Sequence, residues 1–204
     1  MKDANRGILA LAQRMYRYPR RKWVALAGFA LFLLFANFLF TSVDYFKYRD
    51  VIKPDVINLE FAFTASNFAN ILSRWNDIEA FKRSTALLDS LFPIVYSVFF
   101  AFAYAVCRGN RNPEKRDLVF FLAPFVAAIC DYCENAGLLF SLRNMNNRTG
   151  VIATDLSGPV VFAASTFASV KFAILFAVFA AMIIAIGRRD MEQAKSMAKG
   201  QPRH

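Results

Sequence analysis

The chain has 204 residues, 57% of them hydrophobic, and a formal net charge of +10 at pH 7. Soluble domains are usually about 45–50% apolar, so this composition excludes an ordinary soluble core. The basic residues lie mostly at both ends of the chain and in one short connection between apolar stretches, and this distribution argues against nucleic-acid binding.

Residues 1–22 form a basic tail, which is predicted to lie in the cytoplasm, where anionic lipid head groups attract Lys and Arg side chains. Four apolar stretches follow: residues 23–43, 85–107, 118–142 and 159–187. Crossing a hydrocarbon core about 30 Å thick takes roughly 20 residues. Since lipid offers no partner to unpaired backbone groups, each stretch is expected to be a helix. The sequence therefore predicts an all-α fold, with four transmembrane helices bundled in one domain over residues 23–187.

The loop between the first two stretches is expected to hold an amphipathic helix over residues 55–75. Its apolar side chains, from Phe61 to Trp75, follow helical spacing, and Glu60 belongs to the polar face opposite. Such a helix is predicted to lie flat at the outer membrane surface or to cap the bundle.

The later stretches carry their own boundary signals. Pro93 lies inside the second stretch and is expected to kink it. Gly187 is a candidate C-cap of the fourth helix, so residues 188–204 are predicted to form a second cytoplasmic tail. Cytoplasmic segments of membrane proteins carry an excess of Lys and Arg. The charge pattern therefore predicts a multi-pass membrane protein with both termini in the cytoplasm. We expect the membrane to be a bacterial inner (plasma) membrane.

Several polar residues fall inside the apolar stretches. Counting about 1.5 Å per helical residue places Asp131 and Lys171 at mid-membrane and Glu134 one turn nearer to the outside. Glu134 and its neighbour Asn135 share one helix face with Asp131 through i, i+3 and i, i+4 spacing. On the second stretch, Asp89 and Tyr96 lie two turns apart on one face. The candidate residues for binding a ligand or protons are Asp89, Tyr96, Asp131, Glu134, Asn135 and Lys171.

A lone charge at the bilayer centre costs roughly 2.5–3.5 kcal/mol on insertion scales, so these groups are expected to turn inward. Lys171 can neutralise one carboxylate, and the remaining acids must be protonated, hydrated or matched by a ligand cation. The plainer interpretation is structural: an ion pair and a few hydrogen bonds that fix the order of the helices. Buried ion pairs stabilise proteins weakly, however, and an intramembrane acid is by default a candidate functional group.

Other chemical signals are weak. Cys130 and Cys133 form a C-x-x-C pattern, but two neighbouring carboxylates disfavour a thiolate there, which argues against redox catalysis. His204, the one histidine, is the last residue, so the chain lacks a usual set of zinc ligands and cannot hold haem through a histidine in a span. We expect no metal and no cofactor, and we assign no catalytic residue.

The order of features also resembles a known group. A segment ending near Trp75 is followed by the pattern LD-x-x-FP-x-x-Y in "LLDSLFPIVYSVFF" and by D-x-x-E-N in "CDYCEN". Over about residues 58–142 this order is similar to an uncharacterised group of bacterial four-span inner-membrane proteins. The resemblance implies no activity, and Lys171 lies outside it.

Three functional hypotheses follow from these residues. The first is a non-enzymatic membrane protein whose buried acid/lysine cluster binds a small polar or cationic ligand, a lipid head group or protons. The second is a membrane enzyme acting on a lipid or isoprenoid substrate, with Asp131 or Glu134 as general acid–base. The third is an accessory or assembly subunit of a membrane complex, and a membrane protein partner or a homo-oligomer stays open.

Overall fold

The computed structural model describes residues 55–74, 90–109, 113–143 and 157–198. It also describes isolated positions outside these ranges: Gln13, Tyr16, Ala27, Ala30, Phe32, Leu33, Leu34, Asn37, Ile78, Glu79 and Lys82. The helices of the described ranges are α3 (Asp55–Glu60), α4 (Ala65–Leu72), α6 (Phe92–Arg108), α7 (Lys115–Arg143) and α8 (Ser157–Ala198). No strand occurs in the described part of the chain, so the predicted all-α class is confirmed.

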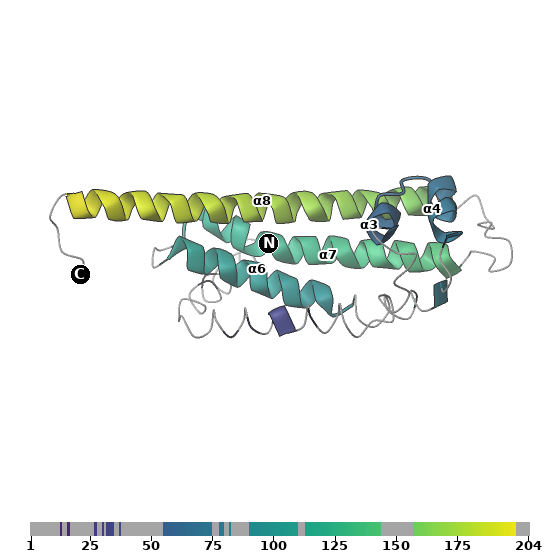
Figure 1. Ribbon diagram of the computed structural model, residues 1–204, viewed down its shortest axis with the longest axis horizontal. Coiled ribbons are helices and arrows are strands. Elements are labelled where there is room, and N and C mark those ends of the chain that lie inside the picture. Colours follow the sequence, from purple (N-terminus) through teal and green to yellow (C-terminus); the bar gives the residue numbers. More distant parts are fainter. Residues whose placement is uncertain are drawn as a thin grey trace, which may run out of the picture.

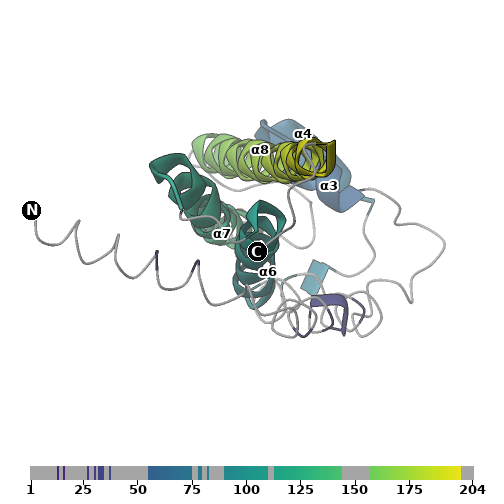
Figure 2. The ribbon, with the colours of Figure 1, turned by 90° about the vertical axis from the view of Figure 1, so that its left-hand side faces the viewer.

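Helices α7 and α8 form a long antiparallel pair, and α6 packs against both (Figures 1 and 2). A small side chain brings α7 close to α8: a Cβ added at Gly137 would lie 3.0 Å from the Cβ of Ala164. Ala164 and Ala168 are both buried on α8, one turn apart on the same face. Small residues at such positions let two helix backbones approach each other closely.

The predicted helix over residues 55–75 is two helices instead of one. The chain turns between α3 and α4, and there Phe63 adopts a left-handed backbone conformation with a φ of 54°. Thr64 then caps α4, because its hydroxyl oxygen accepts the N–H of Asn67 at 3.2 Å. The prediction of one continuous helix is therefore wrong, since the hydroxyl cap and the turn end the first helix at Glu60.

The two short helices cap the bundle at the end where α7 finishes and α8 begins (Figure 1). Leu59, Phe68 and Leu72 are buried there. They share an apolar cluster with Leu138, Leu142, Val161 and Ala164 of α7 and α8. Burying side chains of this size contributes roughly 1.5–3 kcal/mol each, so the cap is firmly attached.

Two boundary predictions are wrong. Helix α6 begins at Phe92, so Pro93 lies in its first turn, where a missing N–H costs no hydrogen bond and causes no kink. Helix α8 does not end at Gly187 but continues to Ala198. The sequence after Gly187 is rich in Met, Glu, Gln, Ala and Lys, which are good helix formers. At about 1.5 Å per residue, its 42 residues make α8 about 63 Å long.

Among the described residues, one helical stretch, Gly158–Arg188, is long and apolar enough to cross a membrane. The first predicted span, residues 23–43, is described only at isolated positions, of which Phe32 stacks on Phe99 of α6 with ring centroids 4.2 Å apart. The number of spans and the side on which each terminus lies stay predictions.

Candidate functional site

The ammonium group of Lys171 lies among three carboxylates. Its Nζ is 2.7 Å from Oε2 of Glu134, 3.1 Å from Oδ1 of Asp131 and 3.5 Å from Oε2 of Glu60. It donates a hydrogen bond to Asp131. The four residues, here called the Lys171 cluster, come from three elements: α3, α7 and α8.

Each element places its member for a local reason. Asp131 and Glu134 are three residues apart on α7 and therefore share one face. The close contact of Gly137 with Ala164 brings that face near α8, and the long side chain of Lys171 spans the remaining gap. Glu60 is the last residue of α3, which lies against α8 through the cap described above.

The cluster is shielded from solvent and unbalanced in charge. The exposed fraction of the side chain is 1% for Glu134, 7% for Lys171, 10% for Asp131 and 18% for Glu60. Three ionised carboxylates around one ammonium would leave two negative charges without a compensating cation. Burying a charge without a partner is costly, so a proton or another cation is needed to balance the cluster.

Glu134 has a buried oxygen atom without a hydrogen bond. Its Oε1 has no hydrogen-bond partner among the described residues. The Tyr96 hydroxyl, on a residue only 3% exposed, faces Asp131 but does not reach it at good hydrogen-bonding geometry. Buried polar atoms are nearly always paired, so Oε1 of Glu134 has room for one more proton or donor.

Aromatic rings flank the cluster on the side of the cap. The Lys171 ammonium lies 4.8 Å from the centroid of the Phe172 ring, at cation–π distance. Phe61 stacks on Phe172 with centroids 5.5 Å apart. The backbone N–H of Phe63 donates to the hydroxyl of buried Ser165 at 3.0 Å. The turn that follows Glu60 is thus attached to α8 on both sides of the cluster.

The structure brings together some of the predicted site residues and not others. Asp131, Glu134 and Lys171 form the cluster, and Tyr96 lies beside it. Asn135 is half-buried next to Glu134 and makes no polar contact with the cluster. Asp89 lies outside the described residues. Glu60 was missed, although Thr64, a strong N-cap residue four positions later, signals that a helix ends before it.

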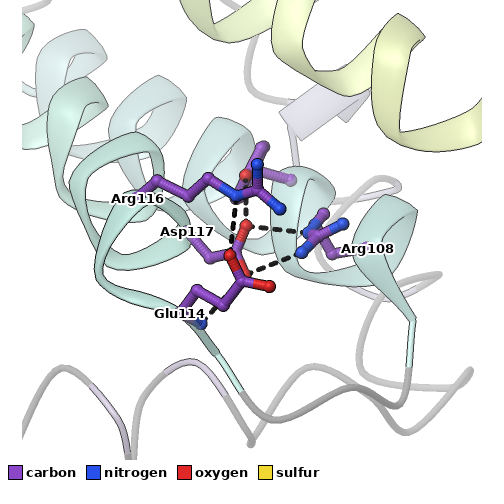
Figure 3. Close-up of polar contacts among 5 residues, drawn as sticks. Arg108, Glu114, Arg116 and Asp117 are labelled. Carbon is purple, nitrogen blue, oxygen red and sulfur yellow. Dashed lines mark hydrogen bonds and ion pairs between the residues drawn. The ribbon is translucent and has the colours of Figure 1, made fainter. Parts of the chain in front are cut away.

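A second buried ionic group lies at the other end of the bundle, where α6 turns into α7 (Figure 3). Arg108 contacts Asp117 with two nitrogens, Nε to Oδ1 and Nη2 to Oδ2, both at 2.8 Å. The Tyr104 hydroxyl donates to Oδ1 at 3.0 Å, and the backbone N–H of Glu114 donates to Oδ2 at 3.0 Å. These four residues, here called the Arg108 corner, satisfy both carboxylate oxygens and balance one charge with another.

The electrostatics of the Arg108 corner follow from these contacts. Burial alone would raise the pKa of Asp117, but the hydrogen bonds from Arg108, Glu114 and Tyr104 outweigh it, and the pKa lies below its ordinary value. The hydrogen bond to Asp117 raises the pKa of Arg108 although burial opposes it. Both groups are therefore held in their charged forms, as expected of a structural ion pair.

The two cysteines of the C-x-x-C pattern, against which the sequence argued as a redox site, lie on α7. Both are free thiols, with Cys130 buried and Cys133 exposed, so they point to different surroundings. The Lys171 cluster, with its excess of acids, is thus the arrangement able to take up a cation. Comparison of the chain with protein-family models, with curated proteins and with solved structures finds no match.

Proposed function

We propose that this protein is a multi-pass membrane protein whose Lys171 cluster binds a proton or a small cation. The observation that carries the proposal is the convergence of three carboxylates on one ammonium in a buried site. An acid inside a membrane helix is by default a candidate for an ion or proton site.

The surface of α8 supports a membrane environment. The most apolar window of Gly158–Arg188 has only 22% of its residues buried, whereas the core helix of a soluble protein would be mostly buried. Large apolar side chains such as Phe162, Phe176 and Ile183 are exposed along it. Lipid is the solvent that accepts such a surface. We propose four spans in a bacterial inner membrane, with both termini in the cytoplasm.

Lipid also strengthens the demand for a cation. A soluble protein could hydrate a surplus carboxylate, but hydrocarbon around the helices offers no such solvation. The surplus negative charge of the cluster must therefore be reduced by bound protons or cations in each state that the protein populates. A site of this kind takes up and releases an ion as its conditions change, which is the basis of ion and proton coupling.

Infrared difference spectroscopy tests the proposal on the purified protein in nanodiscs. A neutral carboxyl group has a carbonyl stretch that an ionised carboxylate lacks. We expect this signal near neutral pH in the wild type and its loss in Glu134→Gln. Glu114→Gln changes an exposed side chain of a residue that joins the Arg108 corner only through its backbone N–H. It is the matched control and should leave the signal unchanged.

A cation other than a proton gives a different result. The carbonyl signal would then be absent, and sodium, potassium or methylammonium chloride would raise the melting temperature of the wild type but not of Glu134→Gln. Absence of the carbonyl signal together with no stabilisation by any of these salts would contradict the proposal.

A further inference from the structure

Resting on the proposed function, we infer that the ion bound by the Lys171 cluster is a proton, and that it exchanges through Glu60 with the end of the bundle covered by α3 and α4. The identity of the ion follows from how the centre of the cluster is filled. The route follows from the different burial of its members and from the apolar packing beyond it.

The space in which a metal ion would sit is already occupied. Three carboxylate oxygens converge within 3.5 Å of one point, and the Lys171 Nζ lies at that point. A second cation of similar size would have to displace the ammonium. A proton needs no such space, because it binds directly to an oxygen that is already present, such as the buried Oε1 of Glu134.

Glu134 faces titratable groups from every neighbouring element. Glu60 of α3 and Asp131 of its own helix are carboxyl groups, and their negative charge favours a proton on Glu134. The phenol of Tyr96 on α6 and the thiol of Cys130 also lie near it and carry no charge while protonated. Lys171 of α8 is the single cation that faces it in the described part of the chain. Like charges close together cannot all ionise, so at least one carboxyl group of the cluster holds a proton.

Glu60 is the member placed to exchange this proton. It has the most exposed side chain of the four, and its ion pair with Lys171 is the longest, at 3.5 Å. It also precedes the turn at Phe63, whose left-handed backbone lets the chain reverse while the N–H remains bound to Ser165. A shift of the Glu60 side chain alone is therefore enough to connect the cluster with the surroundings, while the packed cap stays in place.

In the opposite direction, the described residues of α7 are mainly apolar. Asp117 of the Arg108 corner is 14 residues before Asp131, which corresponds to about 21 Å along α7. The buried residues of α7 between them include Leu118, Phe121, Pro124, Ala127 and Ala128. On α6, the hydroxyl of buried Ser97 is bound to the carbonyl of Ile94 in its own helix. No polar chain among these residues links the cluster to the Arg108 corner.

Carbodiimide labelling in sealed proteoliposomes tests the route. Dicyclohexylcarbodiimide dissolves in lipid and reacts with neutral carboxyl groups: the acid proton passes to one carbodiimide nitrogen, and the carboxylate oxygen adds to the central carbon. Mass spectrometry then measures labelling of Glu134 when the pH is raised on one face only. A protease-sensitive tag at the C-terminus identifies the face opposite to α3 and α4.

We expect labelling of Glu134 to fall when the α3–α4 face is made alkaline and to stay constant when the tagged face is made alkaline. In Glu60→Gln the same response should be delayed by about tenfold or more, since the proton must cross a higher barrier. Glu114→Gln changes an exposed acid outside the Lys171 cluster, so its response should match the wild type.

Equal responses to both faces, or a response to the tagged face alone, would overturn the proposed route. If labelling of Glu134 falls as fast in Glu60→Gln as in the wild type, Glu60 is not part of the proton route. If Glu60→Gln does not fold, the one-sided response of the wild type still decides between the two directions. No labelling of wild-type Glu134 at any pH would instead reject the proton as the ion, and together with no stabilisation by cations it would reject the proposed function itself.

Discussion

The molecule contains two buried ionic groups whose charges are compensated in different ways. In the Arg108 corner one guanidinium faces one carboxylate, and a phenol and a backbone N–H complete the hydrogen bonds (Figure 3). In the Lys171 cluster one ammonium faces three carboxylates, while Oε1 of Glu134 and the Tyr96 hydroxyl lack hydrogen-bond partners among the described residues. The first group is complete without any ligand and the second is not.

This difference separates a structural role from a binding role. A charge-balanced pair whose two carboxylate oxygens are both hydrogen-bonded rigidifies a turn and does not require another ion. A cluster with surplus buried charge is costly unless an ion joins it, so its free energy depends on that ion. Equivalent substitutions in the two groups should therefore change the stability of the protein in different ways.

The largest effect is expected for Lys171→Met. The change leaves three buried carboxylates without a cation, and it should lower the free energy of unfolding by about 3–5 kcal/mol at neutral pH. The loss should shrink at acid pH, because protonation removes the buried charges. Chemical unfolding in detergent at several pH values measures it, with exposed Lys115→Met as the control. A loss that does not depend on pH would contradict the surplus of acids.

Asp117→Asn should cost nearly as much, about 3 kcal/mol, since it leaves Arg108 buried without its partner. This cost should also shrink at acid pH, but for a different reason: here the wild type loses stability, whereas in Lys171→Met the variant regains it. The pKa of Asp117 is lowered on folding, so its contribution to stability is present above about pH 3.9, the unfolded value, and is lost as the pH falls through the folded value. Acid unfolding of the wild type and the variant should therefore converge; curves that stay parallel would refute this account of the corner.

A pair of tyrosine substitutions sharpens the comparison. Tyr104→Phe removes a hydroxyl that donates to a charged carboxylate at 3.0 Å and should cost about 1.5 kcal/mol. Tyr96→Phe removes a buried hydroxyl without a hydrogen-bond acceptor at good geometry and should change stability by less than about 0.5 kcal/mol. Thermal melting of both variants gives the two values, and equal costs would mean that the two phenols have the same role.

The smallest effect concerns the helix contact that positions the Lys171 cluster. Gly137→Ala would place a methyl group 3.0 Å from the Cβ of Ala164, and it should lower stability by about 1 kcal/mol despite the better helix propensity of Ala. Gly187→Ala meets no atom within 4 Å and serves as the matched control, with a gain of up to about 1 kcal/mol. A gain of the same size in both variants would show that the close contact does not matter.

Simple depth counting predicted much of the Lys171 cluster. Asp131, Glu134 and Lys171 interrupt long apolar stretches, and groups at similar depth in adjacent helices have few partners except each other. The sequence did not predict that Glu60 belongs to the cluster. Its helical pattern is equally typical of a helix at the membrane surface and of a helix that caps the bundle. The pattern does not reveal a reversal of the chain, which depends on the left-handed conformation of Phe63 and on its contact with Ser165.

The Arg108 corner and the helix ends illustrate a second limit. Arg108 and Asp117 lie in a charged connection between two apolar stretches, and the sequence indicates only that this connection is cytoplasmic. The packing of α6 on α7 is what buries the two side chains. Pro93 and Gly187 were misplaced because proline at a helix start and glycine within a helix are both allowed locally. Tertiary contacts decide such cases, and a single sequence does not contain them.

The central claim is that the Lys171 cluster binds an ion and does not hold the fold together. Its most direct test is thermal melting in detergent of a variant that combines Glu60→Gln, Asp131→Asn, Glu134→Gln and Lys171→Met, compared with the wild type. Replacing a whole buried ionic cluster by well-packed hydrophobic side chains is often neutral or stabilising, and the amides used here keep the shape of the acids without their charge. We therefore expect the variant to melt at the wild-type temperature or above it, and to lack the infrared signal of the neutral carboxyl group. A much lower melting temperature would contradict the claim and make the cluster a structural one, like the Arg108 corner.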